Sequence, residues 1–275
     1  EAPQKVSDAN LIGTPCPEFE ALMAQEATFL TGKQWGPDTK KKSTQAGEWK
    51  TVKLTWQQQI VGFPASGGKP AYGLSRHPVG KTKDGHAFVF GSSIGGQRKA
   101  AAMVEMHAIG LDIDSGASYD SVRDKIIDMG VAATMYTSWN HQKRGLALKR
   151  DDVLKKLGLT NKDLPDGKLS VEQVRTYLRE FNKNRFEEDF LRQITIAEQA
   201  KPTGDSIKII LDTPEIEKFR VVFFLDKPVS FSELAQTEGT QEAALRLWED
   251  KITGLAQKHL GVHFDTSCTD PSRLF

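Results

Sequence analysis

One stretch decides the fold of this chain: Ala108-Ile109-Gly110-Leu111-Asp112-Ile113-Asp114-Ser115-Gly116. Its apolar residues alternate with Gly110, Asp112 and Asp114, which is the period-two pattern of a strand with one buried face. The two carboxylates therefore lie on the same side of the strand, roughly 6–7 Å apart. Because like charges at that spacing repel each other, the pattern favours a divalent cation between them. An ordinary Asp-Ser-Gly turn without a metal ion is an equally good interpretation of these residues alone.

The residues that follow predict a strand–helix–strand unit. Residues 119–129 carry apolar side chains at helical spacing, and Gly130 is placed to end the helix as a C-cap. Residues 131–137 are then expected to form a second strand. Because a crossover of about 30 residues joins the two strands, we expect them to be parallel or neighbours in one sheet.

Further segments complete the predicted sheet. Residues 207–211 and 219–225 are expected to be strands joined as a hairpin, residues 240–259 an amphipathic helix, and residues 262–275 a last strand with its following turn. The order along the chain resembles the βαββαβ sheet on which many nucleotide-handling proteins are built. Elsewhere, helices are expected at residues 17–30, 151–157 and 170–191, and strands at 52–56 and 87–90.

Composition limits the class of protein. The chain has 275 residues, of which 38% are hydrophobic and 27% charged, and it carries only two cysteines. No apolar run reaches the roughly 20 residues of a membrane span, so we expect a soluble cytoplasmic protein with no membrane partner. The net charge is only +1, yet twelve lysines or arginines against three acids lie between Lys33 and Lys99. This segment could face phosphates, with Trp35, Trp49 and Trp56 stacking on bases, although a solvated surface and core tryptophans explain it as well.

Four motifs occur in a fixed order over about residues 80–275. They are Asp112-x-Asp114, Ser138-x-x-His141, Lys218-Phe-Arg220-Val-Val, and Phe264-Asp265 leading into Asp270-Pro-Ser-Arg273-Leu-Phe. Together they resemble the archaeo-eukaryotic primase superfamily, in particular the primase-polymerases (PrimPol) of phages and mobile elements. Arg220 stands where many members of that family carry histidine, which leaves open whether His141 or Arg220 holds the phosphates of the nucleotide.

The resemblance implies an α/β (α+β) fold, a primase catalytic core built on an RRM-like βαββαβ sheet. The implied organisation is a flexible arm and one catalytic domain, at residues 1–16 and 17–275. Within the domain, the N-terminal α/β unit would be residues 17–106, the catalytic unit residues 107–142 with 206–275, and a helical insertion residues 143–205. Because the chain stops abruptly at Phe275, we expect it to be a fragment that a helicase or priming module follows.

The same resemblance implies an enzyme, a DNA-dependent nucleotidyltransferase. It would transfer nucleotides from ribo- or deoxyribonucleoside triphosphates to a primer 3′-hydroxyl on a single-stranded DNA template, in phage or mobile-element replication. Two Mg²⁺ or Mn²⁺ ions would support this chemistry. The implied catalytic metal ligands are Asp112, Asp114 and Asp265, and the implied nucleotide-binding residues are Ser138, His141, Arg220 and Arg273.

Each of these residues also has a structural interpretation. Asp265 could cap a helix, Arg220 could pair with an acid beside its strand, and His141 could be an exposed loop residue. Arg273 could form an ion pair with Asp270 that orders the turn around the proline between them. For the whole protein the alternatives are a metal-dependent nuclease and a non-catalytic replication-initiation module that binds nucleic acid.

Overall fold

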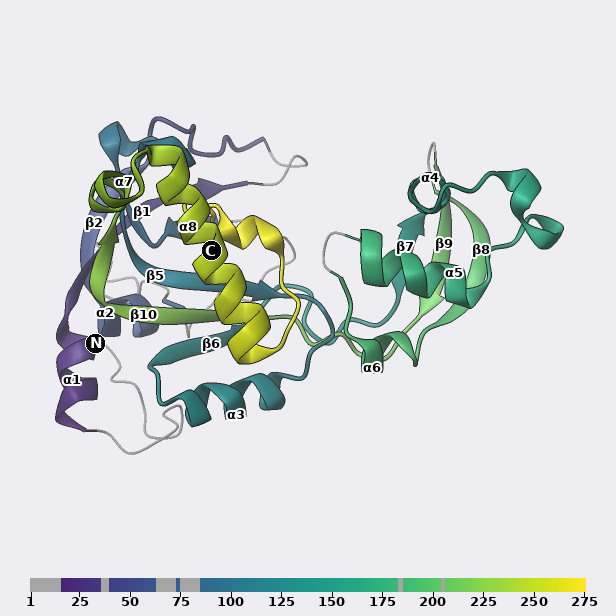
Figure 1. Cartoon of the computed structure of the whole chain (residues 1–275), viewed down its shortest axis with the longest axis horizontal. Helices are drawn as coiled ribbons and strands as arrows, with labels where there is room; N and C mark the ends of the chain where they lie inside the picture. The colour runs from purple at the N-terminus through teal and green to yellow at the C-terminus, as the bar shows by residue number, and fades with distance from the viewer. Residues whose placement is uncertain (1–15, 36–39, 63–72, 75–84, 183–184, 204–205) are drawn as a thin grey trace.

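The computed structural model describes residues 16–35, 40–62, 73–74, 85–182, 185–203 and 206–275. They form a mixed α/β structure with antiparallel sheets, in which Figure 1 shows a larger lobe and a smaller one. The predicted arm lies outside the described residues except for Cys16. Among the described helices, none is both long and apolar enough to cross a membrane.

The large lobe is built on a four-stranded sheet in the order β4-β5-β10-β6. Its strands are β4 (Gly91–Ser93), β5 (Met103–Ile113), β6 (Ala133–Thr137) and β10 (Phe219–Ser230). Both β5 and β6 pair antiparallel with β10, so they are parallel to each other, as the crossover predicted. The prediction of a last strand within residues 262–275 was wrong. Here β4 pairs with the start of β5, and the late segment reaches β5 through Asp265, whose N–H donates to the carbonyl of Asp112.

One face of this sheet carries the helices. Figure 1 shows α8 (Gln241–Gly254) crossing the strands obliquely and α3 (Tyr119–Met129) running alongside β6, and α8 continues as a π-helix over Leu255–Leu260. The ring of Phe219 on β10 meets Tyr119 of α3 edge to face at 5.2 Å, which fixes the face that α3 covers. Gly130 ends α3 in the left-handed conformation, as expected. The helix α7 (Phe231–Glu238) links β10 to α8.

A second, three-stranded sheet extends the large lobe in the order β2-β1-β3. It contains β1 (Glu26–Gln34), β2 (Lys50–Thr55) and β3 (Gly85–Val89), with α1 (Pro17–Ala24) and α2 (Trp56–Val61) beside it. The predicted helix over residues 17–30 was too long. Phe29 and Leu30 belong to the middle strand, whose continuous apolar run is also compatible with a buried helix. The predicted strand over residues 52–56 ends one residue early, because Thr55 and Gln58 form a capping box that starts α2.

Aromatic contacts join the two sheets into one core. Trp56 lies 4.4 Å from the ring of Phe224 on β10 and 5.3 Å from that of Phe29 on β1. The N-terminal unit and the four-stranded sheet therefore share one hydrophobic cluster. The short 3-10 helices of this lobe are Ile94–Gly96, Ala100–Ala102 and Thr266–Thr269.

The small lobe corrects the prediction of a helical insertion over residues 143–205. It has its own sheet, in the order β7-β9-β8, formed by β7 (Leu146–Lys149), β8 (Thr195–Thr203) and β9 (Ser206–Asp212). The strand predicted at residues 207–211 therefore belongs to the insertion, and the hairpin predicted to join it to β10 does not form. The reason is packing, because Ile209 and Leu211 are buried in a second hydrophobic cluster separate from that of the large lobe.

Three helices pack on this small sheet. They are α4 (Arg150–Leu157), α5 (Val171–Thr176), which runs on as a π-helix over Tyr177–Phe181, and α6 (Glu188–Leu191). Short 3-10 helices lie at Asn161–Asp163 and Pro165–Gly167. The predicted capping box at Ser170 and Gln173 is confirmed. The continuous helix predicted over residues 170–191 is wrong, because the chain turns extended at Asn182 before α6 begins.

The two ends of the insertion lie side by side at its junction with the large lobe. The N–H of Gln142 donates to the carbonyl of Ile216, and Lys143 forms a β-bridge with the same residue. Glu187 ties the small lobe to the large one, because its Oε1 accepts from the N–H of His263 and the hydroxyl of Ser115. The insertion is thus a folded unit that enters and leaves the large lobe at one place.

Candidate functional site

The face of the four-stranded sheet opposite α3 and α8 carries a row of polar side chains. Asp112 on β5 lies directly across from Arg220 on β10, and Arg220 lies across from Tyr136 on β6. Two nitrogens of the Arg220 guanidinium approach Oδ2 of Asp112, Nη2 at 3.3 Å and Nε at 3.4 Å. Strand alternation thus brings two of the residues that the motifs singled out into one buried ion pair.

The C-terminal turn brings two more of these residues to the same place. Asp265 Oδ2 accepts a hydrogen bond from Arg273 Nη2 at 3.0 Å, and that nitrogen lies 3.9 Å from Oδ2 of Asp112. Arg273 therefore bridges two acids that are far apart in the sequence. We call Asp112, Asp265, Arg220 and Arg273 the carboxylate–arginine cluster.

One oxygen in this cluster has no hydrogen bond. Asp112 Oδ1 is buried and accepts none, although the residue is only 6% exposed. A buried carboxylate oxygen without a donor is costly, and a cation or a donor from a ligand would satisfy it. The cluster thus has an open coordination position on one of the predicted metal ligands.

The third predicted acid lies one pleat further along the same face. Lys218 Nζ is 3.3 Å from Oδ2 of Asp114, and Lys218 also connects to the predicted Ser138-x-x-His141 turn through its backbone. Its carbonyl accepts from the N–H of Ser138, and its N–H donates to Nδ1 of His141 at 3.1 Å. Ser138 and His141 therefore lie beside Lys218, whose side chain contacts Asp114, and the imidazole contacts the backbone just before β10.

Burial and neighbouring charges shift the pKa values around Asp112. Burial raises the pKa of the Cys268 thiol from its ordinary 9.0 to about 12, and the nearby Asp112 carboxylate adds to this. Burial also raises the pKa of Tyr136. For Arg220, burial alone would lower the pKa, but Tyr136 and Asp112 outweigh it, and the pKa is raised overall. The guanidinium of Arg220 is therefore a permanent cation between the phenol of Tyr136 and the carboxylate of Asp112.

Asp265 and Arg273 each had a structural interpretation besides the catalytic one. Asp265 is indeed a cap, because its Oδ1 accepts from the N–H and hydroxyl of Ser267, yet its Oδ2 remains for Arg273. The ion pair suggested between Arg273 and Asp270 does not form. Asp270 accepts instead from Ser272. The guanidinium of Arg273 is directed at the predicted catalytic acids.

Sequence reasoning missed four residues at this face. Lys218 and Tyr136 flank the cluster, and the N–H of Asp112 donates to Sγ of Cys268 at 3.2 Å. The ring of Phe275 lies over Gly110, where a Cβ would come within 2.4 Å of it, and 5.6 Å from the guanidinium of Arg220. The alternation Lys218-x-Arg220 was a usable signal for the lysine. Phe275 ends the fourth motif but was given no role, and nothing in the sequence pattern pointed to Tyr136 or Cys268.

The predicted metal site is only partly assembled. Across the described part of the chain, no three histidine, cysteine or acidic side chains are arranged to hold a metal ion. The cations Arg220, Arg273 and Lys218 lie against the three predicted ligands instead. Asp112 and Asp265 still fit a divalent cation, since one oxygen of Asp112 lacks a donor and both acids contact the same guanidinium nitrogen.

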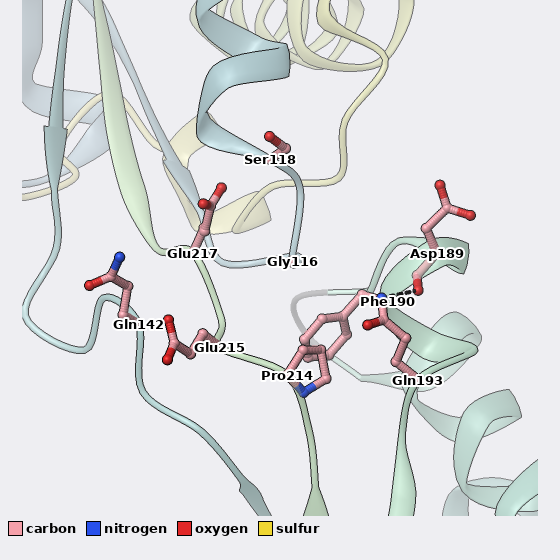
Figure 2. Close-up of a pocket in the computed structure, with 9 residues that line it drawn as sticks. All are labelled: Gly116, Ser118, Gln142, Asp189, Phe190, Gln193, Pro214, Glu215 and Glu217. Atoms are coloured by element: carbon pink, nitrogen blue, oxygen red, sulfur yellow. Dashed lines mark hydrogen bonds between the residues drawn. The ribbon is translucent and has the colours of Figure 1, made fainter.

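A separate pocket of about 230 Å³ lies at the junction of the two lobes. Figure 2 shows Ser118 and Glu217 from the large lobe on one side of it, and Phe190 of α6 with Gln193 just after that helix on the other. Its acidic residues are Asp189, Glu215 and Glu217, and it contains none of the predicted site residues. Such a lining disfavours a triphosphate, so this pocket is distinct from the predicted nucleotide site.

The tryptophans of the basic segment turn out to have different surroundings. Trp49 and Trp56 are buried in the core of the large lobe, which excludes them from stacking on bases. Trp35 is half-buried, with Lys41 Nζ over its ring at 4.2 Å.

No family model, no curated protein and no solved structure matches this chain. The geometry of the cluster and the resemblance of the motifs are therefore the basis on which a function is inferred.

Proposed function

We propose that the large lobe is a template-dependent nucleotidyltransferase, a primase-polymerase catalytic domain whose reaction takes place at the carboxylate–arginine cluster. The observation that supports this most strongly is the meeting of Asp112 with Asp265. The two acids are far apart in the chain, yet both contact Nη2 of Arg273 on the sheet face opposite the helices. Folding that brings acids together at a cost in repulsion is typical of a site for cations or for phosphoryl transfer.

The acids would hold divalent metal ions. Asp112 and Asp265 are the ligands that fit, with Asp114 one pleat away on the same face. Two Mg²⁺ or Mn²⁺ ions, when bound, would activate the primer 3′-hydroxyl and stabilise the leaving pyrophosphate. A nuclease would use the same acids with water as the attacking group.

The arginines would hold the triphosphate. Arg220 and Arg273 are permanently charged and carry planar guanidinium groups, which suit bidentate contacts with phosphate oxygens. In the free protein they neutralise the acids, and a nucleotide with its metal ions would exchange these contacts for phosphate contacts. His141 lies beside Lys218 at the end of the same face, so Arg220 is the better placed of the two groups to hold the phosphates.

Primer extension tests the proposal. The assay supplies a labelled primer on a single-stranded template, Mg²⁺ or Mn²⁺, and the ribo- or deoxyribonucleoside triphosphates as separate sets. We expect template-dependent lengthening by the wild-type chain and its loss in Asp112→Asn. The matched control is Asp120→Asn, because Asp120 is an exposed acid paired with Arg123 on α3.

The other outcomes distinguish the alternatives. Shortening of the primer by the wild-type chain alone would indicate a nuclease. Binding of DNA that is the same with and without divalent metal, with no extension and no nucleotide binding, would indicate a non-catalytic replication-initiation module. Either result would contradict the proposal.

A further inference from the structure

The loop between β4 and β5 carries an arginine without a counter-ion. Arg98 lies between the two short 3-10 helices of this loop and is half-buried. Among the described residues, its side chain forms no ion pair and a single hydrogen bond, from Nη1 to the carbonyl of Ser272 at 3.5 Å. Its Nε is buried without an acceptor. Because a guanidinium carries five N–H donors and keeps its charge, most of its bonding capacity is left for an anion.

Packing fixes the position of this guanidinium. Its central carbon lies 5.6 Å from the ring of Trp49, within the range of a cation–π contact. The N–H of Trp49 donates to the carbonyl of Gly96, and the N–H of Arg98 donates to that of Ala46. Gly96 has a φ of +65°, and a Cβ there would lie 2.2 Å from the carbonyl oxygen of Trp49. The loop therefore holds the charge in place before any ligand binds.

The acids of the segments that contact this loop are directed elsewhere. Glu48 Oε2 accepts from a backbone N–H of its own turn, and Asp270 Oδ1 accepts from the serine two residues after it. Neither acid forms an ion pair with Arg98. The arginines of the cluster differ, because Arg220 pairs with one of the predicted metal ligands and Arg273 pairs with another. The charge of Arg98 is thus still available to a ligand of the same site.

The place of Arg98 distinguishes between ligands that carry phosphates. The carbonyl that it contacts belongs to Ser272, directly before Arg273 of the cluster. In the sheet order β4-β5-β10-β6, Arg98 follows β4 at one edge, whereas the turn with His141 follows β6 at the other edge. These edges are three strand spacings apart, about 14 Å. A triphosphate held at Arg220 therefore leaves the β4 edge to a second, longer ligand.

We infer that Arg98, with the exposed Lys99 beside it, binds a backbone phosphate of the nucleic-acid strand on which the site acts. The inference rests on the proposed function for the role of that strand as template or primer. Guanidinium donors fit the oxygens of a phosphodiester, and such contacts position a strand without reading its sequence. The strand would reach the cluster from the β4 edge, beside the C-terminal turn.

The test measures binding of a labelled single-stranded oligonucleotide by fluorescence anisotropy. The intact chain is titrated at several salt concentrations, with EDTA and without nucleotide. The variants are Arg98→Gln and Lys99→Gln, each made separately. The control is Arg246→Gln, which removes the same charge from an exposed arginine of α8, on the sheet face opposite the cluster. A second titration uses a labelled nucleoside triphosphate with Mg²⁺, and urea unfolding checks each fold.

We expect Arg98→Gln to bind the strand about tenfold more weakly, as for the loss of one charge-assisted hydrogen bond. One phosphate contact fewer should make the dependence of log K on log salt shallower by about 0.7. Lys99→Gln should change in the same direction with an unchanged urea midpoint, because its side chain is exposed. This variant decides the case in which Arg98→Gln also lowers the midpoint. Arg246→Gln should bind the strand as the wild type does.

Triphosphate binding should be the same in all four proteins. The inference would be overturned if the wild-type chain bound no strand, or if both loop variants kept its affinity and salt slope. An equal loss in Arg246→Gln would show a general charge effect instead. Weaker triphosphate binding by Arg98→Gln with unchanged strand binding would assign the arginine to the nucleotide. If the wild-type chain extends no primer but its strand binding depends on Arg98, the proposed catalytic function fails and the strand contact stands.

Discussion

At the scale of single residues, Asp112 is held by contacts from its side chain and from both of its backbone polar groups. Its carboxylate is buried and pairs with Arg220, its N–H donates to Cys268, and its carbonyl accepts from Asp265. Every polar group of Asp112 except Oδ1 has a hydrogen-bond or ion-pair partner, so Oδ1 is the atom that remains for a ligand.

Replacing Asp112 should destabilise the fold as well as the reaction. In Asp112→Asn the guanidinium of Arg220 stays buried without its counter-ion, and breaking such a pair typically costs about 3–5 kcal/mol. Urea unfolding followed by tryptophan fluorescence measures this cost. Asp120→Asn, in an exposed pair, should lose less than about 1 kcal/mol. Equal effects of the two variants would show that the Asp112–Arg220 pair is not buried as described.

Cys268 should make stability dependent on alkaline pH. The folded state keeps its thiol protonated up to a pKa of about 12, whereas the unfolded chain loses that proton near 9.0. Between these values the unfolded state binds fewer protons, so the free energy of unfolding falls as pH rises, by up to about 1.4 kcal/mol per pH unit. Urea unfolding of wild type, Cys268→Ala and Cys16→Ala at pH 8 to 10.5 checks this.

The slope should be shallower in Cys268→Ala and unchanged in Cys16→Ala, because Cys16 is exposed. Identical slopes in all three proteins would mean that the Cys268 thiol is not buried beside Asp112.

The acids and arginines of the cluster could be predicted because each lies in a short motif. Their exact partners could not. The motif around Asp270 and Arg273 suggested a local pair, whereas the fold directs Arg273 to Asp265 and Asp112. Such long-range pairings depend on how the C-terminal turn docks on β5, which no local pattern contains.

At the scale of elements, the packing of Phe275 on β5 requires a glycine. Gly110→Ala should be destabilised by about 1–3 kcal/mol, because the new Cβ would lie 2.4 Å from the ring of Phe275. Gly254→Ala is the matched control, since nothing lies within 4 Å of its Cβ position in α8. Thermal unfolding of Gly110→Ala, Phe275→Ala and the double variant measures the coupling between the two sites.

We expect the double variant to be more stable than the sum of the single changes predicts, because removing the ring removes the clash. Strict additivity would contradict the contact between Gly110 and Phe275.

Elements with a local signal were predicted well. The helix α3 and its Gly130 cap have helical periodicity and a stop signal, and both are confirmed. The middle strand β1 was wrongly predicted as helix because its buried residues are consecutive, without the alternation of buried and exposed residues that indicates a strand. The strand β9 was recognised but assigned to the wrong sheet, since strand pairing is a long-range property.

At the scale of the whole molecule, the two hydrophobic clusters predict two partly independent folding units. All five tryptophans lie outside residues 143–216, so tryptophan fluorescence reports only on the large lobe. Leu178→Ala removes a fully buried side chain from the small lobe and should destabilise it by about 2–5 kcal/mol. Urea unfolding followed by far-ultraviolet circular dichroism and by tryptophan fluorescence compares the two units.

In Leu178→Ala, the circular dichroism transition should begin at lower urea while the fluorescence midpoint stays near that of wild type. The matched variant Leu111→Ala, in the core of the large lobe, should lower the fluorescence midpoint. Parallel shifts of both signals in Leu178→Ala would mean that the lobes unfold as one unit.

The central claim is that the acids gathered on β5 carry out nucleotide addition. Its most direct test is primer extension by Asp265→Asn beside Asp270→Asn. The carboxylates of both aspartates accept hydrogen bonds from a serine in the same C-terminal turn, and asparagine can keep these bonds. Only the carboxylate of Asp265 contacts the guanidinium of Arg273, beside Asp112. We expect extension to be lost in Asp265→Asn and retained in Asp270→Asn. Equal activity of the two variants would contradict a catalytic role for the carboxylate–arginine cluster.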